Sequence, residues 1–237
     1  MSSNVVFVFG GTGNIGSSIC LELLKLNYHV YFTWSSNIEN KKSLLEESKK
    51  ISDQYFLKPI NYTFGDNTDF FFDFLELNKD NDISLVFNTG INGGRLDILD
   101  LSIDSFKQVL DVNVLMSFEF VKKFYNFIKS NNLSKRYNII FISSQIASFG
   151  SPDLVSYCAS KGAVNSMALA LSKSFGHIPI NVNVVSPGII DNNYNLRLDI
   201  PLGRSGFPYE VANVVSFLLS RESSFINGAI IPVHGGR

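Results

Sequence analysis

The stretch that decides the fold is Val5-Val6-Phe7-Val8-Phe9-Gly10-Gly11-Thr12-Gly13-Asn14-Ile15-Gly16. Its first five residues predict a short buried strand, and helical periodicity follows the glycines as far as Leu26. Glycines at such a turn let the backbone bend tightly and approach a pyrophosphate, whose charge is favoured by the N–H groups at the start of the helix. An ordinary turn is the alternative. The expected cofactor contacts here are Gly10, Thr12, Gly13, Asn14, Ile15 and Gly16.

The rest of the chain repeats this alternation of short apolar runs and longer segments with helical spacing. The strands are expected at 5–9, 29–33, 60–64, 83–87 and 137–142, and the helices include 70–77, 117–130 and 159–175. Strands that alternate with helices indicate a parallel sheet with its ligand at the carboxyl ends of the strands. We therefore expect an α/β, doubly wound Rossmann fold with three layers.

Composition excludes several classes of protein. The chain has 237 residues, of which 45% are hydrophobic, so we expect one domain spanning 1–237. Its net charge of −1 and pI near 6.3 argue against nucleic-acid binding. No apolar run approaches the roughly 18 residues of a membrane span, and a strand that starts at Val5 leaves no room for a signal peptide, so a cytoplasmic location is expected. Cys20 and Cys158 fall within expected helices, as reduced packing residues do, and no metal site is expected.

The end of the second expected strand bears on the choice of cofactor. It continues into Trp34-Ser35-Ser36, so the position that would hold an acidic residue for a ribose 2′-hydroxyl is not acidic. This disfavours NAD(H). Ser35, with Ser36 and Lys41 or Lys42, is a candidate partner for a 2′-phosphate, so NADP(H) is the expected cofactor, although both lysines also fit a solvated helix face.

Two further strand ends supply candidate contacts. Asp66 follows the third expected strand and is a candidate for an adenine edge, with a solvated turn aspartate as the alternative. Asn88 and Gly90 follow the fourth, where a close approach of backbone to cofactor is expected.

Three groups that could take part in proton transfer, a hydroxyl, a phenol and an ammonium, follow the fifth expected strand. Ser144 follows it, and Tyr157 and Lys161 are four residues apart, so on a helix they share one face. A nearby positive charge favours phenolate, which would bring the pKa of a tyrosine closer to the working pH for proton transfer. Ser144 is preferred to Ser143 because neighbouring strand residues face opposite ways.

These motifs, in this order, resemble the short-chain dehydrogenase/reductase family. The segments that carry the resemblance are the glycine turn, Asn88-Thr89-Gly90, Asp111-Val112-Asn113-Val114, the Ser144, Tyr157 and Lys161 set, and Ser186-Pro187-Gly188. The tail, from Ile200-Pro201-Leu202-Gly203-Arg204 to Val233-His234-Gly235-Gly236, is similar to 3-oxoacyl-[acyl-carrier-protein] reductases. The resemblance implies a parallel seven-stranded sheet flanked by helices.

The resemblance also implies roles for individual residues. Tyr157 is the acid/base, Lys161 lowers its pKa and holds the nicotinamide ribose, and Ser144 binds the substrate carbonyl. Asn113 supports a proton-relay water, or alternatively only a local backbone kink. Further cofactor contacts are expected at Pro187, Gly188 and Ile190.

The chain also departs from the family pattern. Asn14 replaces a glycine of the usual turn, Phe87 replaces the first of two asparagines, Asn192 stands where a threonine is common, and His234 replaces an aspartate. We expect His234 to be a packing or interface residue.

The segment of about 189–207 is shorter than the helical lid of many relatives, so we expect an open site. Such a site suits a small-molecule or carrier-bound ketone, with Gln145, Tyr194 and Leu196 as candidate substrate contacts.

The expected activity is therefore NADPH-dependent reduction of a ketone, most concretely a 3-oxoacyl thioester. A dehydrogenase of a sugar, polyol or other secondary alcohol is the nearest alternative, and a non-catalytic dinucleotide-binding protein or a partner subunit is the alternative of another class. The helix bearing Phe118, Phe120, Phe124 and Phe127 and the helix after Lys161 carry more apolar residues than one buried face needs. These helices are therefore expected to pack against another subunit, and the family resemblance implies a homo-oligomer, either a tetramer or a dimer.

Overall fold

A parallel sheet of seven strands runs through the centre of the computed structural model, which describes residues 4–52, 54–175 and 178–237. Its strand order is β3-β2-β1-β4-β5-β6-β7, with the connection reversing between β1 and β4. The strands are β1 Asn4–Phe9, β2 His29–Trp34, β3 Leu57–Asn61, β4 Asp82–Phe87, β5 Tyr137–Ile142, β6 Ile180–Pro187 and β7 Ile230–Val233. Because every strand pair is parallel, all carboxyl ends meet at one edge.

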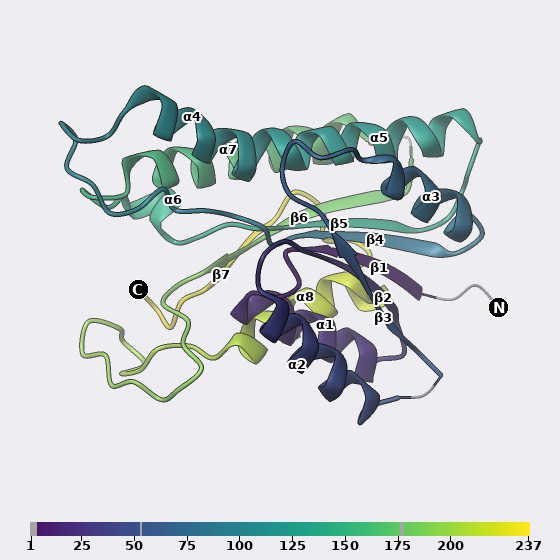
Figure 1. The fold of residues 1–237 in the computed structure, drawn as a ribbon, viewed down its shortest axis with the longest axis horizontal. Coiled ribbons are helices and arrows are strands. Elements are labelled where there is room, and N and C mark those ends of the chain that lie inside the picture. Colours follow the sequence, from purple (N-terminus) through teal and green to yellow (C-terminus); the bar gives the residue numbers. More distant parts are fainter. Residues whose placement is uncertain (1–3, 53, 176–177) are drawn as a thin grey trace.

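Helices cover both faces of this sheet (Figure 1). The lower layer of the view contains α1 Asn14–Lys25, α2 Ile38–Lys49 and α8 Pro208–Leu219. The upper layer contains α3 Asp69–Asn78, α4 Ile103–Leu110, α5 Met116–Ser130 and α7 Val155–Ser174. The short helix α6 Ile146–Phe149 follows β5, a π-helical turn (Asp111–Leu115) joins α4 to α5, and a 3-10 turn (Arg221–Ser223) follows α8. The three-layer, doubly wound fold expected from the sequence is confirmed.

Each face of the sheet has its own core because successive strand residues point to opposite sides. Along β1, Phe7 and Phe9 join an aromatic core with residues of α3 and α5. Val6 and Val8 point the other way, into an aliphatic core with α1 and α8. Burial on both faces explains why β1 and β5 are mostly apolar runs, interrupted only by Asn4 and Asn138, and why their positions were predictable.

The third strand differs from the prediction. It begins at Leu57 and ends at Asn61, paired only with β2, so it forms an edge of the sheet. Pro59 fits an edge strand because proline has no N–H, and on an edge strand that position can face solvent without the loss of a hydrogen bond between strands. The residues expected to continue the strand instead form a turn, in which Asp66 Oδ2 accepts a hydrogen bond from Thr63 N (2.8 Å).

Two helix predictions also need correction. Helix α7 begins at Val155, four residues before the expected start at 159, which places both Tyr157 and Lys161 within it. In α5, Phe120, Phe124 and Phe127 are buried in the core, and of the four phenylalanines expected to exceed one buried face only Phe118 is exposed. Within the described residues, no helix combines the length and apolar character that crossing a bilayer requires.

Candidate active site

The glycine turn between β1 and α1 is held by polar contacts from the ends of two other strands, β2 and β4. Gly10 has a φ of +78°, a conformation that favours glycine, and its N–H donates to Thr33 Oγ1 (2.8 Å). Its carbonyl accepts from Asn88 Nδ2 (2.8 Å). A Cβ on Gly16 would lie 2.1 Å from Gly10 O, so only glycine allows this close approach of helix and turn. The side chain of Asn88 thus supports the turn, and the close approach of its backbone to the cofactor stays a prediction.

The start of α1 is open where an anion would sit. A Cβ on Gly13, the N-cap residue, would have its nearest neighbour at 3.9 Å, and no side chain caps the helix. The first N–H groups of a helix have no acceptor within it, so those of Asn14, Ile15 and Gly16 are available to a pyrophosphate. This cradle fits the phosphates of a dinucleotide.

A cation lies beside the end of β2. The Lys41 ammonium lies 3.8 Å from the centre of the Trp34 ring, and exposed Ser35 and Ser36 follow that tryptophan. Asn40 Nδ2 donates to Thr12 O (3.1 Å), which ties the start of α2 to the glycine turn. The cation and the hydroxyls expected from the sequence thus adjoin the cradle.

The serine pair after β5 faces two directions, as predicted. Ser143 is buried and its hydroxyl donates to Lys161 O (3.3 Å). Ser144 is partly exposed, and its Oγ accepts only a long hydrogen bond from Ile146 N (3.5 Å). Ser144 is therefore the hydroxyl that remains available to a ligand at this strand end.

The tyrosine and lysine of α7 lie together near the cradle. Lys161 Nζ lies 5.5 Å from the centre of the Tyr157 ring and donates to Ile142 O (2.8 Å) at the end of β5. A Cβ on Gly90 would lie 3.4 Å from Lys161 Nζ and 3.3 Å from Asn113 Oδ1. Residues from β4, the π-helical turn and α7 thus meet at one point, as expected for a single site.

Burial dominates the protonation of this pair. It lowers the pKa of Lys161 to about 8, and it raises the pKa of Tyr157, with a smaller contribution from the neighbouring Cys158. The sequence predicted the opposite direction for Tyr157, through the charge of Lys161. In this structure burial of the phenol raises its pKa, so Tyr157 is a neutral phenol near pH 7.

Asn113 is a clamp at a helix irregularity. Its Nδ2 donates to Ile91 O (2.9 Å) and to Ser160 Oγ (2.9 Å), and its Oδ1 accepts from Ile91 N (2.8 Å). The residue lies in the π-helical turn, so the local kink given as an alternative is present. Because both amide hydrogens are engaged, a relay water here would have to donate to Oδ1 or be held by main-chain groups.

The remaining predicted contacts are divided between the cleft and the surface. Gly188 lies where a Cβ would meet His234 Cβ at 2.7 Å and Gln145 Oε1 at 3.1 Å, and Pro187 O accepts from Gln145 N (2.9 Å). Ile190 bridges Gly206 at the base of the segment 189–207. Asp66 lies in the exposed turn after β3, where one of its oxygens is already used.

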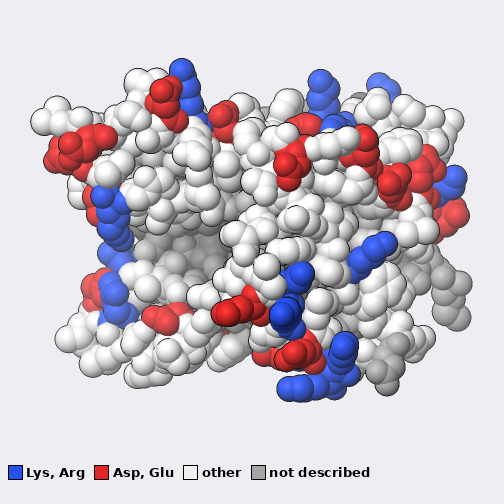
Figure 2. All heavy atoms as spheres, in the orientation of Figure 1, with Lys and Arg blue, Asp and Glu red and all other residues white. Residues whose placement is uncertain are grey.

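The segment 189–207 forms one wall of a hollow that opens at the left of Figure 2. A bridge between Leu196 and Arg204 folds it back on itself, and Arg204 donates to both oxygens of Glu210 (2.9 and 2.7 Å) at the start of α8. Tyr194 and Leu196 are 64% and 67% exposed, so they are available to a ligand but contribute little to the core.

Several supporting residues had no signal strong enough to predict them. Thr33 and Ser160 accept hydrogen bonds that fix Gly10 and Asn113, and an ion pair between Arg95 and Asp153 joins the loop after β4 to the loop before α7. For Thr33, its place at the end of the expected strand 29–33 was the one sequence feature that indicated such a role. In the described part of the chain, no cluster of histidine, cysteine and carboxylate side chains could hold a metal ion.

This geometry defines a dinucleotide-binding oxidoreductase site with a serine, tyrosine and lysine set. The chain belongs to the short chain dehydrogenase family, whose model matches residues 4–199. It is an NAD(P)-dependent oxidoreductase.

Curated relatives point the same way. One is the 3-oxoacyl-[acyl-carrier-protein] reductase FabG of Rickettsia bellii (strain RML369-C), which is 32% identical over 100% of this chain and 97% of its own. Another is the 3-oxoacyl-[acyl-carrier-protein] reductase MabA of Mycobacterium bovis (strain ATCC BAA-935 / AF2122/97), which is 33% identical over 64% of each chain. The predicted family resemblance is confirmed.

Solved structures share the fold. The acetoin dehydrogenase YohF from Salmonella typhimurium superimposes with a TM-score of 0.87 at 21% identity, over 100% of this chain and 96% of its own. A dehydrogenase/reductase from Sinorhizobium meliloti 1021 gives a TM-score of 0.84 at 25% identity, over 100% of this chain and 95% of its own.

Proposed function

We propose that this protein uses NADPH to reduce the ketone of a 3-oxoacyl thioester to a secondary alcohol. The observation that carries the proposal is the meeting of Tyr157, Lys161, Asn113 and Gly90 next to an open dinucleotide cradle, with the available hydroxyl of Ser144 at the end of β5. The substrate class comes from the relatives, which are named as 3-oxoacyl-[acyl-carrier-protein] reductases.

The protonation of Tyr157 suits the reductive direction of the reaction. Reduction builds negative charge on the ketone oxygen, which needs a donor to orient it and an acid to protonate it. Burial raises the pKa of Tyr157, so at neutral pH the residue carries the proton that this oxygen must receive. Ser144 orients the same oxygen. The bound nicotinamide supplies the hydride.

Lys161 has two roles in this mechanism. Its backbone-anchored ammonium, 5.5 Å from the Tyr157 ring centre, stabilises the phenolate left after proton transfer. Its position next to Gly90 also suits contact with the nicotinamide ribose. Asn113 holds the loop after β4 in place, and a water at its kink would return a proton to Tyr157.

The preference for NADPH rests on the end of β2. No carboxylate follows Trp34 in Ser35-Ser36, and the Lys41 ammonium lies against the Trp34 ring. A ribose 2′-phosphate at Ser35 would meet hydroxyls and a cation there, and no like charge from these residues.

The short segment 189–207 suits a substrate that is presented on a carrier. We propose that it acts as an open lid, with Tyr194 and Leu196 against the acyl chain and Gln145 beside the reacting carbon. A non-catalytic role is less consistent with the chain, because Ser144, Tyr157 and Lys161 are all present, Ser144 just after β5 and the other two within α7.

The test is NADPH oxidation with acetoacetyl-CoA and with an acetoacetyl carrier protein, compared with NADH and with a sugar ketone. Thioester turnover that prefers NADPH supports the proposal. Turnover of the sugar ketone alone contradicts the substrate, and a preference for NADH contradicts the cofactor. NADPH binding, measured by its fluorescence, without turnover of any ketone would contradict the catalytic role.

A further inference from the structure

A pocket separate from the candidate active site lies at the amino-terminal ends of the strands, whereas the candidate active site lies at their carboxyl ends. It has a volume of about 320 Å³ and opens where β1, β4 and β5 begin, against the end of α8. Because the strands are parallel, this edge is separated from Gly10 and Ser144 by the length of the sheet. Its lining is mostly polar and includes Tyr28, Asp82, Ser84, Arg136, Asn138, Arg221 and Glu222.

The floor of this pocket is polar where the fold calls for apolar residues. Ser84 and Asn138 are neighbours in the register of β4 and β5 and are 4% and 3% exposed. Two residues further along the same face, Val86 and Ile140 belong to the aliphatic core. A parallel sheet covered on both faces normally has apolar side chains at such positions. This polar pair therefore needs an explanation other than core packing.

One atom of that pair has its hydrogen-bonding capacity unused. Asn138 Nδ2 donates to Ser84 Oγ (3.3 Å), whereas Asn138 Oδ1 is buried and has no hydrogen-bond partner in the described residues. A buried acceptor without a donor destabilises the folded state, and such groups are rare unless a ligand or water pairs with them. Asn138 lines the pocket, so a small turn of its side chain would bring this closed-off oxygen to a donor there.

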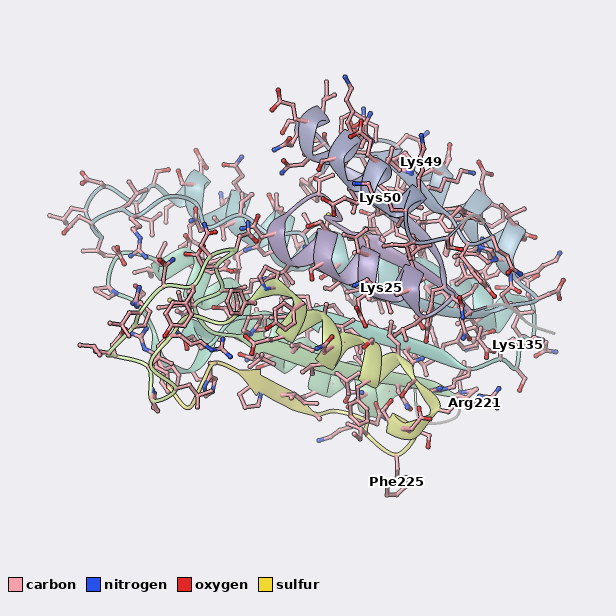
Figure 3. The ribbon with its side chains drawn as sticks, turned by 90° about the horizontal axis from the view of Figure 1, so that it is seen from below. Lys25, Lys49, Lys50, Lys135, Arg221 and Phe225 are labelled. Atoms are coloured by element: carbon pink, nitrogen blue, oxygen red, sulfur yellow. The ribbon has the colours of Figure 1, made fainter. Side chains whose placement is uncertain are left out.

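The wall of the pocket offers a cation. Arg136 donates one guanidinium hydrogen bond to Ser220 O, and it forms none of the ion pairs found within the described residues. Asp82 and Glu222 lie within electrostatic reach of the same space, since both raise the pKa of Tyr28 while Arg136 lowers it, beneath the larger effect of burial. Figure 3 shows Lys135 and Arg221 at this end of the molecule, so three basic side chains, with Arg136, lie beside the carboxylates Asp82 and Glu222.

We propose that this pocket binds a small carboxylate that also carries an amino or hydroxyl group, such as an amino acid or a hydroxy acid. The carboxylate pairs with the guanidinium of Arg136, and the donor group pairs with Asn138 Oδ1 on the floor. A volume of about 320 Å³ is at the lower end of the range for small-molecule sites, which fits a small metabolite rather than a nucleotide. This site is independent of the reductase function proposed above.

The test uses three probes of similar size, L-alanine, L-lactate and propionate, each titrated at millimolar concentration by calorimetry and by amide chemical shifts. Alanine or lactate should bind, with shifts at the starts of β4 and β5, and propionate should bind at least roughly tenfold more weakly because it has no donor for Asn138. Equal affinity for propionate would overturn the role of Asn138. No binding of alanine or lactate would overturn the proposal and leave a water-filled pocket.

Variants locate the site. Asn138→Leu and Arg136→Gln should each weaken binding by roughly tenfold or more, while the matched control Lys135→Gln, next to the pocket but not lining it, should change affinity less than about twofold. Arg136→Lys provides a second, milder variant in case Arg136→Gln does not fold. Circular dichroism checks that each variant is folded. Undiminished binding in folded Asn138→Leu and Arg136→Gln would contradict the assignment.

Discussion

Replacing Gly16 by alanine is expected to damage both stability and cofactor binding. The new Cβ would lie 2.1 Å from Gly10 O and 2.7 Å from Asn88 Nδ2, and the first of these atoms belongs to the backbone. Overpacking of this kind costs about 1–3 kcal/mol, and separating Asn88 from Gly10 adds about 1 kcal/mol. The free energy of unfolding should therefore fall by about 2–4 kcal/mol, equivalent to about 4–16 °C in Tm for a chain of this size.

Gly13→Ala is the matched control for that experiment. Its Cβ meets no atom closer than 3.9 Å, so its stability should change by less than about 1 kcal/mol, the size of an N-cap effect. The added methyl group would still point into the cradle and weaken the binding of NADPH. Urea unfolding and NADPH fluorescence titration separate the two effects. Unchanged stability in Gly16→Ala, or a loss of stability in Gly13→Ala as large as that in Gly16→Ala, would refute the packing argument.

Three further predictions concern charged groups. The folded pKa of Lys161, about 8, lies below its unfolded value, so its burial destabilises the protein below pH 8 and this penalty disappears as the pH rises toward 10.5. The stability of Lys161→Met relative to the wild type, measured as the difference in their free energies of unfolding in urea, should therefore be up to about 3 kcal/mol more favourable at pH 7 than at pH 10.5. The same difference at both pH values would contradict this prediction. Arg204 lowers the pKa of Glu210, so this pair stabilises the segment 189–207 at neutral pH and weakens as the pH falls through the lowered pKa; Glu210→Gln should speed proteolysis within that segment at pH 7, and an unchanged rate would count against the pair. Lys41→Ala should weaken the binding of NADPH at least about fivefold in fluorescence titrations and change the affinity for NADH by less than about twofold. An equal effect on both affinities would show that Lys41 does not contact the 2′-phosphate.

The fold was predictable because most of its signals are local. The run at 137–142 is apolar except for Asn138, and the structure gives β5 the same bounds. The glycine turn likewise predicts the strand before it and the helix after it from the twelve residues 5–16. The third strand was misplaced because an edge strand is only partly buried, so its apolar pattern is weak and Pro59 resembles a strand breaker.

The electrostatics of the site depend on contacts between distant segments. The pKa of Tyr157 rises because the assembled fold buries the phenol, which the spacing of Tyr157 and Lys161 does not reveal. Asn113 becomes a clamp only because the loop at Ile91 comes within hydrogen-bonding distance of it. The open acceptor at Asn138 likewise depends on the register of β4 against β5, which no local pattern encodes.

The most direct test of the proposed chemistry is the rate of NADPH oxidation with an acetoacetyl thioester in Tyr157→Phe, with Tyr125→Phe as its matched control. Tyr125 is also four residues before a lysine on a helix, but its ring stacks on Phe175 (4.8 Å between centroids). Tyr157→Phe should lose at least about a hundredfold in kcat while still binding NADPH, because the general acid is missing. Tyr125→Phe should keep its rate within about threefold. Equal activity in the two variants would contradict Tyr157 as the acid.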